Sequence, residues 1–197
     1  MNSQVQRMQT QSQRNTQKKL LRSCSIIRYM HKYKTALFIG RFQPFHNGHL
    51  YSLNKCLEIA EKVVIAVGSS QESGTENNPW DYKIRKRMVC EVVRGLEVEN
   101  RIKKICSCPD NPSDSVWLTD LIRRAGDFDV VVSNNDWVLS IFREAGYSAY
   151  ESGLHNRDEL EGLKIRGLMR AGNEEWRGRV PKEIVELFDN NDVEMIR

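Results

Sequence analysis

Two histidines three residues apart carry the first chemical signal of the chain. They are His46 and His49, within the stretch GRFQPFHNGHL at residues 40–50, and the whole chain has only four histidines. Positions three apart share one face of a helix, so both imidazoles would lie at the start of a helix that begins near residue 46. Imidazoles beside the positive end of a helix can donate hydrogen bonds to phosphate oxygens. The spacing therefore predicts that the two histidines bind a reacting phosphate.

The rest of this stretch fits an anion site better than a metal site. Arg41 adds a fixed positive charge, and Gly40 lets a ligand approach the backbone. Neither the GxGxxG pattern of dinucleotide-binding folds nor the GxxxxGK[ST] pattern of phosphate loops is present at this turn. No cysteine or acidic residue stands beside the histidines to complete a set of zinc ligands. We therefore expect no metal ion held by the protein itself.

The elements that must position these residues alternate between strands and helices. Short apolar runs predict strands at residues 35–40, 62–70, 102–108, 128–135 and 148–152. Helical spacing of apolar residues predicts helices at residues 48–61, 81–96, 114–126 and 136–147. The remainder is predicted to be helical, with Pro181 at the first position of a helix. This alternation is typical of an α/β fold with a doubly wound, Rossmann-like parallel sheet, which binds ligands at the carboxyl ends of its strands.

Length and composition limit the classes of protein to which the chain can belong. At 197 residues it is long enough for one domain with a substantial core. No apolar run approaches the ~20 residues that a membrane span needs, so we expect no membrane partner. The five cysteines include no CxxC pair, which favours free thiols in a reducing compartment. These features predict a cytoplasmic globular protein.

The positive charge of the chain is concentrated at its N-terminus. Eight of the 30 Lys and Arg residues lie in the first 34 residues, which contain no acidic residue. The rest has 22 basic and 26 acidic residues, so we expect no nucleic-acid partner unless the N-terminal arm recruits one. Residues 1–29 are predicted to be a disordered basic extension, and residues 30–197 to be the functional domain. Three interpretations of the extension remain open: a tail without a role, a mitochondrial targeting peptide, or a segment that precedes a translation start at Met30. We favour the first.

The stretch GRFQPFHNGH resembles the signature of the HxGH nucleotidyltransferase superfamily, and the chain is similar to the archaeal-type nicotinamide-mononucleotide adenylyltransferases within it. Further similar segments follow in the family's order along residues 35–189: GSSQES…NNPWDYKIRKRM, PDNPSDSVW, VVSNN and VPKEIVEL. The GRFQPFHNGH motif is specific for the superfamily. Each of the other segments is weak evidence alone, but together and in this order they support the resemblance. The resemblance implies that residues 30–197 form a nucleotidyltransferase domain with the HxGH nucleotidyltransferase fold.

The resemblance also implies an activity, the transfer of the adenylyl group of ATP to nicotinamide mononucleotide (NMN), which gives NAD and pyrophosphate. The NMN phosphate would attack the α-phosphorus of ATP in line, without a general base, because it is largely dianionic at neutral pH. Mg²⁺ would arrive with ATP, held by phosphate oxygens and water. The expected partners are then ATP, NMN and further copies of the chain in a homo-oligomer. Transfer to another phosphate monoester, or a nucleotide-binding protein without turnover, are the alternatives.

The family's functional positions can be carried over residue by residue. Those implied to contact the reacting phosphates are His46, His49, Arg41 and Arg166. Those implied to bind ATP are Gly40, Arg41, Phe42, Gln43, His46, Gly48, His49, Ser133 and Arg166. Those implied to bind NMN are Ser69, Asn78, Pro79, Trp80, Asp110 and Trp117.

The resemblance gives three of the NMN residues specific roles. Trp117 would stack on the pyridine ring, and Trp80 would close the loop beside it. A place in the core or an interface is an equal alternative for Trp117, and it is favoured for Trp80 and Trp137. Asp110 would accept a hydrogen bond from the carboxamide, unless it is a solvated acid of a loop.

One segment departs from the family pattern. The family's second phosphate motif has the form SxTxxR, and the aligned segment here is EGLKIRGLM, residues 161–169. Arg166 matches the arginine, but Glu161 and Leu163 replace the two hydroxyl residues. A carboxylate beside a polyphosphate lowers the affinity for ATP unless Glu161 points away, and Leu163 would leave the binding to backbone N–H groups. This departure motivates the alternative of a nucleotide-binding protein without turnover.

Overall fold

The computed structural model of the chain describes residues 31–153 and 160–196. The chain divides into two units, Met1–Met30 and His31–Arg197. The predicted extension, residues 1–29, lies outside the described residues. The fold and the site belong to the second unit.

Within the described residues, five parallel strands form one sheet in the order β3-β2-β1-β4-β5. The strands are β1 (Tyr33–Gly40), β2 (Ala60–Gly68), β3 (Ile102–Cys108), β4 (Val130–Ser133) and β5 (Ser148–Glu151). The α-helices are α2 (Asn47–Ile59), α3 (Tyr82–Gly95), α4 (Asp114–Ala125), α5 (Asp136–Glu144), α6 (Gly162–Arg170) and α7 (Lys182–Asp189). Two short 3-10 helices are η1 (Glu99–Arg101) and η2 (Glu174–Arg179). The strand order is that of Rossmann-like sheets, so the predicted doubly wound α/β fold is confirmed.

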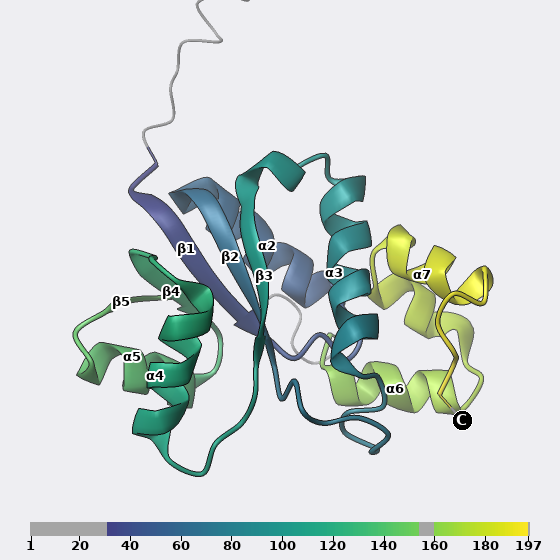
Figure 1. Ribbon diagram of the computed structural model, residues 1–197. Coiled ribbons are helices and arrows are strands. Elements are labelled where there is room, and N and C mark those ends of the chain that lie inside the picture. The colour runs from purple at the N-terminus through teal and green to yellow at the C-terminus, as the bar shows by residue number, and fades with distance from the viewer. Residues whose placement is uncertain (1–30, 154–159, 197) are drawn as a thin grey trace, which may run out of the picture. The chain divides into compact units, whose positions relative to one another are not determined.

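Helices cover both faces of the sheet, and each face has its own core. α2 and α3 pack on one face, where α7 packs against α3 and α6 contributes to the same core, and α4 and α5 pack on the other face (Figure 1). The side chains of β1 alternate between the cores: Ala36 and Phe38 belong to the first and Leu37 to the second. A strand that is buried on both faces reads as a continuous apolar run, and this is why such runs predicted the strands.

Several predicted boundaries differ from the structure by a few residues. α2 ends at Ile59 rather than at residue 61, because Ala60 already pairs with Tyr33 as the first residue of β2. β4 is shorter than the strand predicted at residues 128–135. Pro181 precedes α7 rather than beginning it, since its ψ of 153° is extended.

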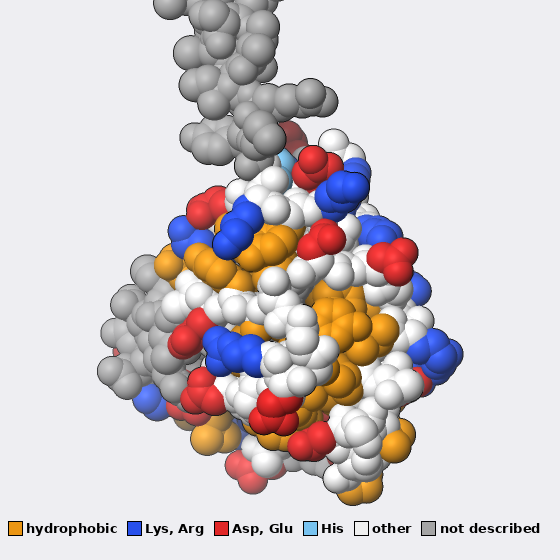
Figure 2. Space-filling view, turned by 90° about the vertical axis from the view of Figure 1, so that its left-hand side faces the viewer, with side chains coloured by type: hydrophobic (Ala, Val, Ile, Leu, Met, Phe, Trp, Pro, Cys, Tyr) orange, Lys and Arg blue, Asp and Glu red, His pale blue; other side chains and the backbone are white. Residues whose placement is uncertain are grey.

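The surface of the described unit carries charges of both signs. Figure 2 shows Lys and Arg side chains among Asp and Glu side chains and apolar areas, on the side that carries β5 and α5. On this side the two signs of charge alternate and do not form one continuous patch. None of the described helices is long and apolar enough to cross a membrane.

The chain changes direction at the centre of the sheet, between β1 and β4. β1 is followed by α2 on one face, whereas its neighbour β4 is followed by α5 on the other. Connections that leave in opposite directions open a crevice at the carboxyl ends of the two strands. Gly40 ends β1 and Ser133 ends β4, so the crevice lies where the histidine stretch begins.

Candidate active site

A cavity of about 410 Å³ lies at the carboxyl ends of the strands. Six residues of the predicted ATP set line it: Gly40, Arg41, His46, Gly48, His49 and Ser133. Three residues of the predicted NMN set also line it: Ser69, Asp110 and Trp117. The fold thus brings together side chains that follow or end β1, β2, β3 and β4.

The two histidines hold each other at the start of α2. His46 precedes the helix, with extended backbone angles (φ −131°, ψ 171°), and His49 is the third residue of the helix. The Nδ1 atom of each ring accepts a hydrogen bond from the backbone N–H of the other residue, at 3.3 Å in both cases. The rings stack with their centroids 3.7 Å apart. The predicted pair is therefore formed, by mutual capping and stacking rather than by two positions on one helical face.

These hydrogen bonds decide where each imidazole carries its proton. A neutral imidazole has one acceptor nitrogen and one N–H, so rings that accept at Nδ1 carry the hydrogen at Nε2. Burial, and then the charge of Arg166, lowers the pKa of His46 to about 4. Burial, and then His46 and Arg41, lowers the pKa of His49 well below its usual value. Both rings are therefore neutral at pH 7, and each keeps an Nε2–H to donate to a ligand.

The low pKa of His46 predicts a loss of stability in mild acid. The ring has a pKa of 6.5 in the unfolded chain and about 4 in the folded protein, so the unfolded state binds more protons between these values. The free energy of unfolding should therefore fall as the pH drops from about 6.5 to about 4, by up to about 3 kcal/mol for this group. Chemical denaturation at a series of pH values measures this fall.

The matched variant for this experiment is His46→Asn. An asparagine side-chain oxygen can still cap α2 but does not titrate in this range. The part of the pH dependence that His46 causes should therefore vanish in the variant, while the part due to His49, whose pKa is lowered mainly by burial, should remain. An identical pH profile in both proteins would show that His46 keeps an ordinary pKa in the folded state.

Phe42 supports the histidine pair from the core. Its ring packs against His49, with centroids 4.7 Å apart, and stacks on Phe45 at 5.5 Å. Its φ of 54° is uncommon for a residue with a side chain. A Cβ atom at Gly40 would lie 2.8 Å from the Phe42 ring, so this ring requires a glycine there. Phe42 is fully buried and does not line the cavity, so its side chain packs in the core beside the histidines.

Gln43 and Trp80 join two loops inside the core instead of lining the cavity as predicted. The Gln43 amide donates to the Trp80 carbonyl oxygen (2.8 Å) and accepts from the Trp80 backbone N–H (3.2 Å). The Trp80 indole donates to the carbonyl oxygen of Glu194, and its ring packs on Phe188. The structure thus supports the core alternative for Trp80. Two more predicted NMN residues lie outside the lining: Asn78 and Pro79.

Arg166 lies behind the cavity wall, bonded to backbone carbonyls. It is 3% exposed, and its guanidinium donates to the carbonyl oxygens of Gln43 (2.8 Å) and Glu76 (3.1 Å). Arg166 is not part of the lining, but Gly162 is, and a Cβ atom at Gly162 would lie 3.2 Å from Nη1 of Arg166. Arg166 therefore links two loops through its hydrogen bonds, with its charge near His46, and its predicted contact with the phosphates stays a prediction.

The segment that departs from the family pattern forms the start of α6. Glu161 precedes the helix and lines the cavity, and its side chain does not cap the helix. Leu163 is 51% exposed and is not part of the lining. A Cβ atom at Gly162 would lie 3.1 Å from the carbonyl oxygen of Gln43, so α6 begins close against the histidine loop. Leu163 thus leaves the first backbone N–H groups of α6 to a ligand, whereas the Glu161 carboxylate stays at the site.

Two tryptophans form an aromatic wall of the cavity. Trp117 on α4 is 3% exposed and packs against Trp137 on α5, with ring centroids 4.8 Å apart. Trp137 is 44% exposed and lines the cavity, whereas the sequence favoured a core or interface position. Its place in the chain was a usable signal, because it is the second residue of the helix that follows a central strand.

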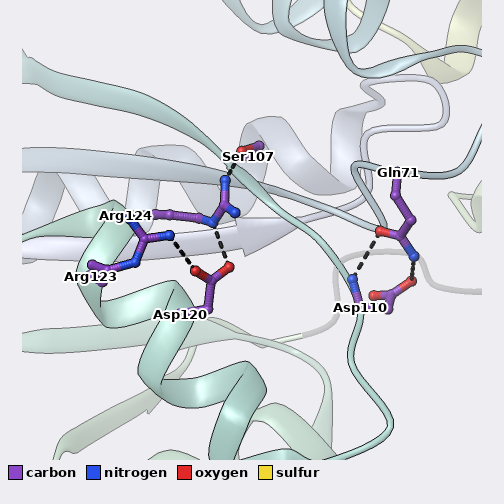
Figure 3. Close-up of polar contacts among 6 residues, drawn as sticks. All are labelled: Gln71, Ser107, Asp110, Asp120, Arg123 and Arg124. Atoms are coloured by element: carbon purple, nitrogen blue, oxygen red, sulfur yellow. Dashed lines mark hydrogen bonds and ion pairs between the residues drawn. The ribbon is translucent and has the colours of Figure 1, made fainter.

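Gln71 holds Asp110 in place at the cavity. The Gln71 amide donates to Oδ2 of Asp110 at 3.0 Å and accepts from the Asp110 backbone N–H at 2.9 Å (Figure 3). The other group in Figure 3, in which Arg124 bonds to Asp120, lies on α4 outside the cavity lining. Asp110 therefore offers an oriented carboxylate in the same lining as Trp117.

The fold and the site together define the class of protein. Residues 37–170 match the model of the cytidylyltransferase-like family. A bifunctional NMN adenylyltransferase/ADP ribose pyrophosphatase from Francisella tularensis shares the fold, with a TM-score of 0.66 and 19% sequence identity. That comparison covers 80% of this chain and 50% of the other. The chain belongs to the cytidylyltransferase-like family.

Sequence relatives narrow the family further. Proteins named nicotinamide-nucleotide adenylyltransferase are 35% identical over 161 residues in Halorubrum lacusprofundi and 36% identical over 157 residues in Methanosarcina acetivorans. These alignments cover 81% and 80% of this chain, and 89% and 88% of the relatives. Within the cytidylyltransferase-like family, the chain is thus a member of the nicotinamide-nucleotide adenylyltransferases, and the resemblance drawn from the HxGH motif is confirmed.

Proposed function

We propose that the protein transfers the adenylyl group of ATP to NMN, forming NAD and pyrophosphate. The observation that carries this proposal is the pair of neutral imidazoles, His46 and His49, in the wall of the cavity beside Arg41. The two sequence relatives described above are named for this activity. The three side chains supply hydrogen bonds and positive charge where the nucleotide phosphates would lie.

The reaction is a displacement at the α-phosphorus of ATP. An oxygen of the NMN phosphate bonds to that phosphorus, the bond from it to the bridging oxygen of the β-phosphate breaks, and pyrophosphate leaves with the electron pair. No proton has to be removed from NMN, because a phosphate monoester has its second pKa near about 6 and is largely dianionic at neutral pH. Catalysis then consists of positioning the two substrates and stabilising the charge that moves.

Neutral, fixed histidines suit such a reaction. The Nε2–H groups of His46 and His49 donate to phosphate oxygens on which negative charge builds up, and Arg41 neutralises part of that charge. Backbone N–H groups at the start of α6, near Gly162, supply further donors. Since both rings are held through their Nδ1 atoms, they need no reorientation as the charge moves.

A divalent cation enters the site with ATP in this proposal, and we propose Mg²⁺. In residues 31–153 and 160–196 no three His, Cys, Asp or Glu side chains gather as a metal site, so phosphate oxygens and water would supply most ligands. Asp110 and Glu161 are carboxylates of the cavity lining that could complete the set. A solved complex of the bifunctional enzyme from Francisella tularensis contains AMP and a Mn ion.

The aromatic end of the cavity is proposed to bind NMN. The rings of Trp117 and Trp137 offer a stacking surface for the pyridinium ring of NMN, which is flat and positively charged. The carboxylate of Asp110, which Gln71 orients, can accept hydrogen bonds from the carboxamide N–H groups. ATP would then occupy the end of the cavity that the histidines and the start of α6 form.

A substrate panel tests the proposed function directly. The protein is incubated with ATP, Mg²⁺ and a series of phosphate monoesters, and the products are identified by mass spectrometry. Formation of NAD from NMN, with pyrophosphate, is the expected result. A product from a different monoester would favour the alternative transferase, and nucleotide binding without any product would favour the binding protein that Glu161 suggests.

Removing the carboxylate at the start of α6 should improve the binding of ATP. Glu161→Ser replaces a negative charge in the cavity lining by a hydroxyl donor, so the KM for ATP should fall by a few-fold to about tenfold. The matched control is Leu163→Thr, which should change the KM by less than about twofold because Leu163 lies outside the lining. Steady-state kinetics of both variants and of the double variant measures this.

Each outcome of this series has a separate meaning. An unchanged KM in Glu161→Ser would show that the carboxylate turns away from the bound phosphates. An effect of Leu163→Thr equal to that of Glu161→Ser would contradict the placement of Leu163 outside the cavity. Turnover that appears only in the double variant would identify the native chain as a binding protein.

A further inference from the structure

Arg85 on α3 is a buried cation whose hydrogen bonds reach the cavity wall. Its side chain is 0% exposed, and none of the ion pairs found among residues 31–153 and 160–196 includes it. A charge that is buried without a counter-ion is unfavourable unless hydrogen bonds compensate for the lost water. The hydrogen bonds of Arg85 must therefore compensate for the cost of burying its charge.

The guanidinium of Arg85 uses all of its donors, and every acceptor is a backbone carbonyl oxygen. A guanidinium has five N–H groups, one on Nε and two on each Nη. Nε makes one bond, and Nη1 and Nη2 make two each. The acceptors are the carbonyl oxygens of Asp81 (3.2 Å), Arg41 (2.9 Å), Gly68 (2.6 Å), Ser69 (3.0 Å) and Glu72 (3.5 Å).

Three of these acceptors belong to residues that line the cavity. Arg41 follows β1, and Gly68 and Ser69 end and follow β2, so Arg85 ties together the carboxyl ends of two neighbouring strands. Ser69 has a φ of 46°, in the left-handed region that residues with a side chain seldom adopt. Such a conformation persists where surrounding bonds hold it, and Arg85 supplies one to the carbonyl of Ser69 itself.

The charge of Arg85 also acts on the cavity. Burial lowers the pKa of Arg85, and Asp81 and Asp110 raise it, yet a guanidinium stays protonated at any ordinary pH. The positive charge of Arg41 lies close enough to disfavour the charged form of Arg85, which lowers the pKa of Arg85 further. Two neighbouring cations repel one another until an anion binds between or beside them, so the pair favours a phosphate in the cavity.

We propose that Arg85 is a positioning residue of the phosphate site, which sets the backbone at Arg41 and Ser69 through its carbonyl hydrogen bonds and draws anions into the adjoining cavity. The effect on turnover rests on the proposed function. The effect on anion binding does not, because inorganic pyrophosphate alone can probe it.

The test compares Arg85→Lys with Arg94→Lys. A lysine keeps the charge but has three donors on a single nitrogen, so it cannot bridge the five carbonyls. Arg94 lies on the same helix, its side chain is 64% exposed, and it pairs with Glu91 on the surface. In Arg85→Lys we expect the affinity for pyrophosphate, measured by calorimetry, to fall about tenfold or more, and kcat for NAD formation to fall at least as much. Both values should stay within about twofold in Arg94→Lys.

A structural role alone predicts a different pattern. It would lower the melting temperature of Arg85→Lys but leave pyrophosphate affinity and kcat of the folded variant unchanged, and that result would overturn the proposal. If the wild-type protein forms no NAD, the proposed function fails, whereas the pyrophosphate comparison still decides the role of Arg85. The two inferences therefore fail separately.

A measurement on the wild-type protein covers the case in which Arg85→Lys does not fold. The Nε–H of Arg85 is bonded and buried, so its proton should exchange slowly and give a resolved NMR signal. Added pyrophosphate should shift this signal, because the bonds of Arg85 end on residues of the cavity wall, and should leave in place that of the bonded and buried indole N–H of Trp80. No shift of the Arg85 signal at saturating pyrophosphate would overturn the proposal.

Discussion

Replacing His49 by alanine should lower kcat about 100-fold or more and leave the fold intact. The Nε2–H of His49 is a fixed donor on a residue of the cavity lining, and the loss of one such donor to a developing charge typically costs about 2.7–4 kcal/mol of transition-state stabilisation. Alanine is a good helix former, so the change costs stability through the lost mutual cap, about 1 kcal/mol, and through the lost contacts of the ring with His46 and Phe42. Steady-state kinetics at saturating ATP and NMN measures kcat, and circular dichroism with thermal melting reports the fold.

His49→Asn separates the two roles of the ring. The asparagine oxygen can lie where Nδ1 lies and still accept from the backbone N–H of His46, but the side chain is too short to place a donor where Nε2–H lies. We therefore expect this variant to be more stable than His49→Ala and as inactive. Turnover close to normal in either folded variant would remove His49 from the catalytic site.

The sequence could predict that His46, His49 and Arg41 lie together at one cavity, because their residue types and spacing mark a single polar segment at the end of a strand. His46 and His49 lie at the first turn of α2, and Arg41 directly follows β1, so the three polar side chains are close in the chain. A motif does not show, however, which of its side chains face the ligand. In the tight turn with a positive φ at Phe42, Arg41 lines the cavity while Phe42 enters the core, although the two are adjacent in the chain.

Features that depend on distant partners could not be predicted from local patterns. β2 begins at Ala60 because Ala60 pairs with Tyr33. The helical spacing of apolar residues around Ala60 carries no information about this pairing. Arg166 and Arg85 look like surface or ligand-binding cations in the sequence, and only the fold brings them to the carbonyl groups that satisfy them. Trp137 is of a residue type that usually packs in a core, so its type alone does not predict that it lines the cavity, whereas its place at the start of the helix after β4 does.

Replacing Trp117 by leucine should raise the KM for NMN about tenfold or more and leave the KM for ATP within about twofold. Stacking of a flat base on an aromatic side chain is worth about 1–3 kcal/mol, and leucine keeps apolar volume against Phe142 while it removes the aromatic face. The interaction is the same in the ground state and in the transition state, so kcat should change little. Steady-state kinetics with each substrate varied in turn measures both KM values.

Two further tryptophans separate stacking from packing in this experiment. Trp137 is 44% exposed, so Trp137→Ala removes little of the core and should still raise the KM for NMN several-fold. Trp80 is buried outside the cavity, so Trp80→Phe should lower the melting temperature and leave both KM values unchanged. Equal rises of both KM values in Trp117→Leu, or a loss of stability with normal KM values, would make Trp117 a core residue only. In that case the Trp137→Ala result would decide whether the aromatic wall binds NMN at all, because that variant tests the same surface without disturbing the core.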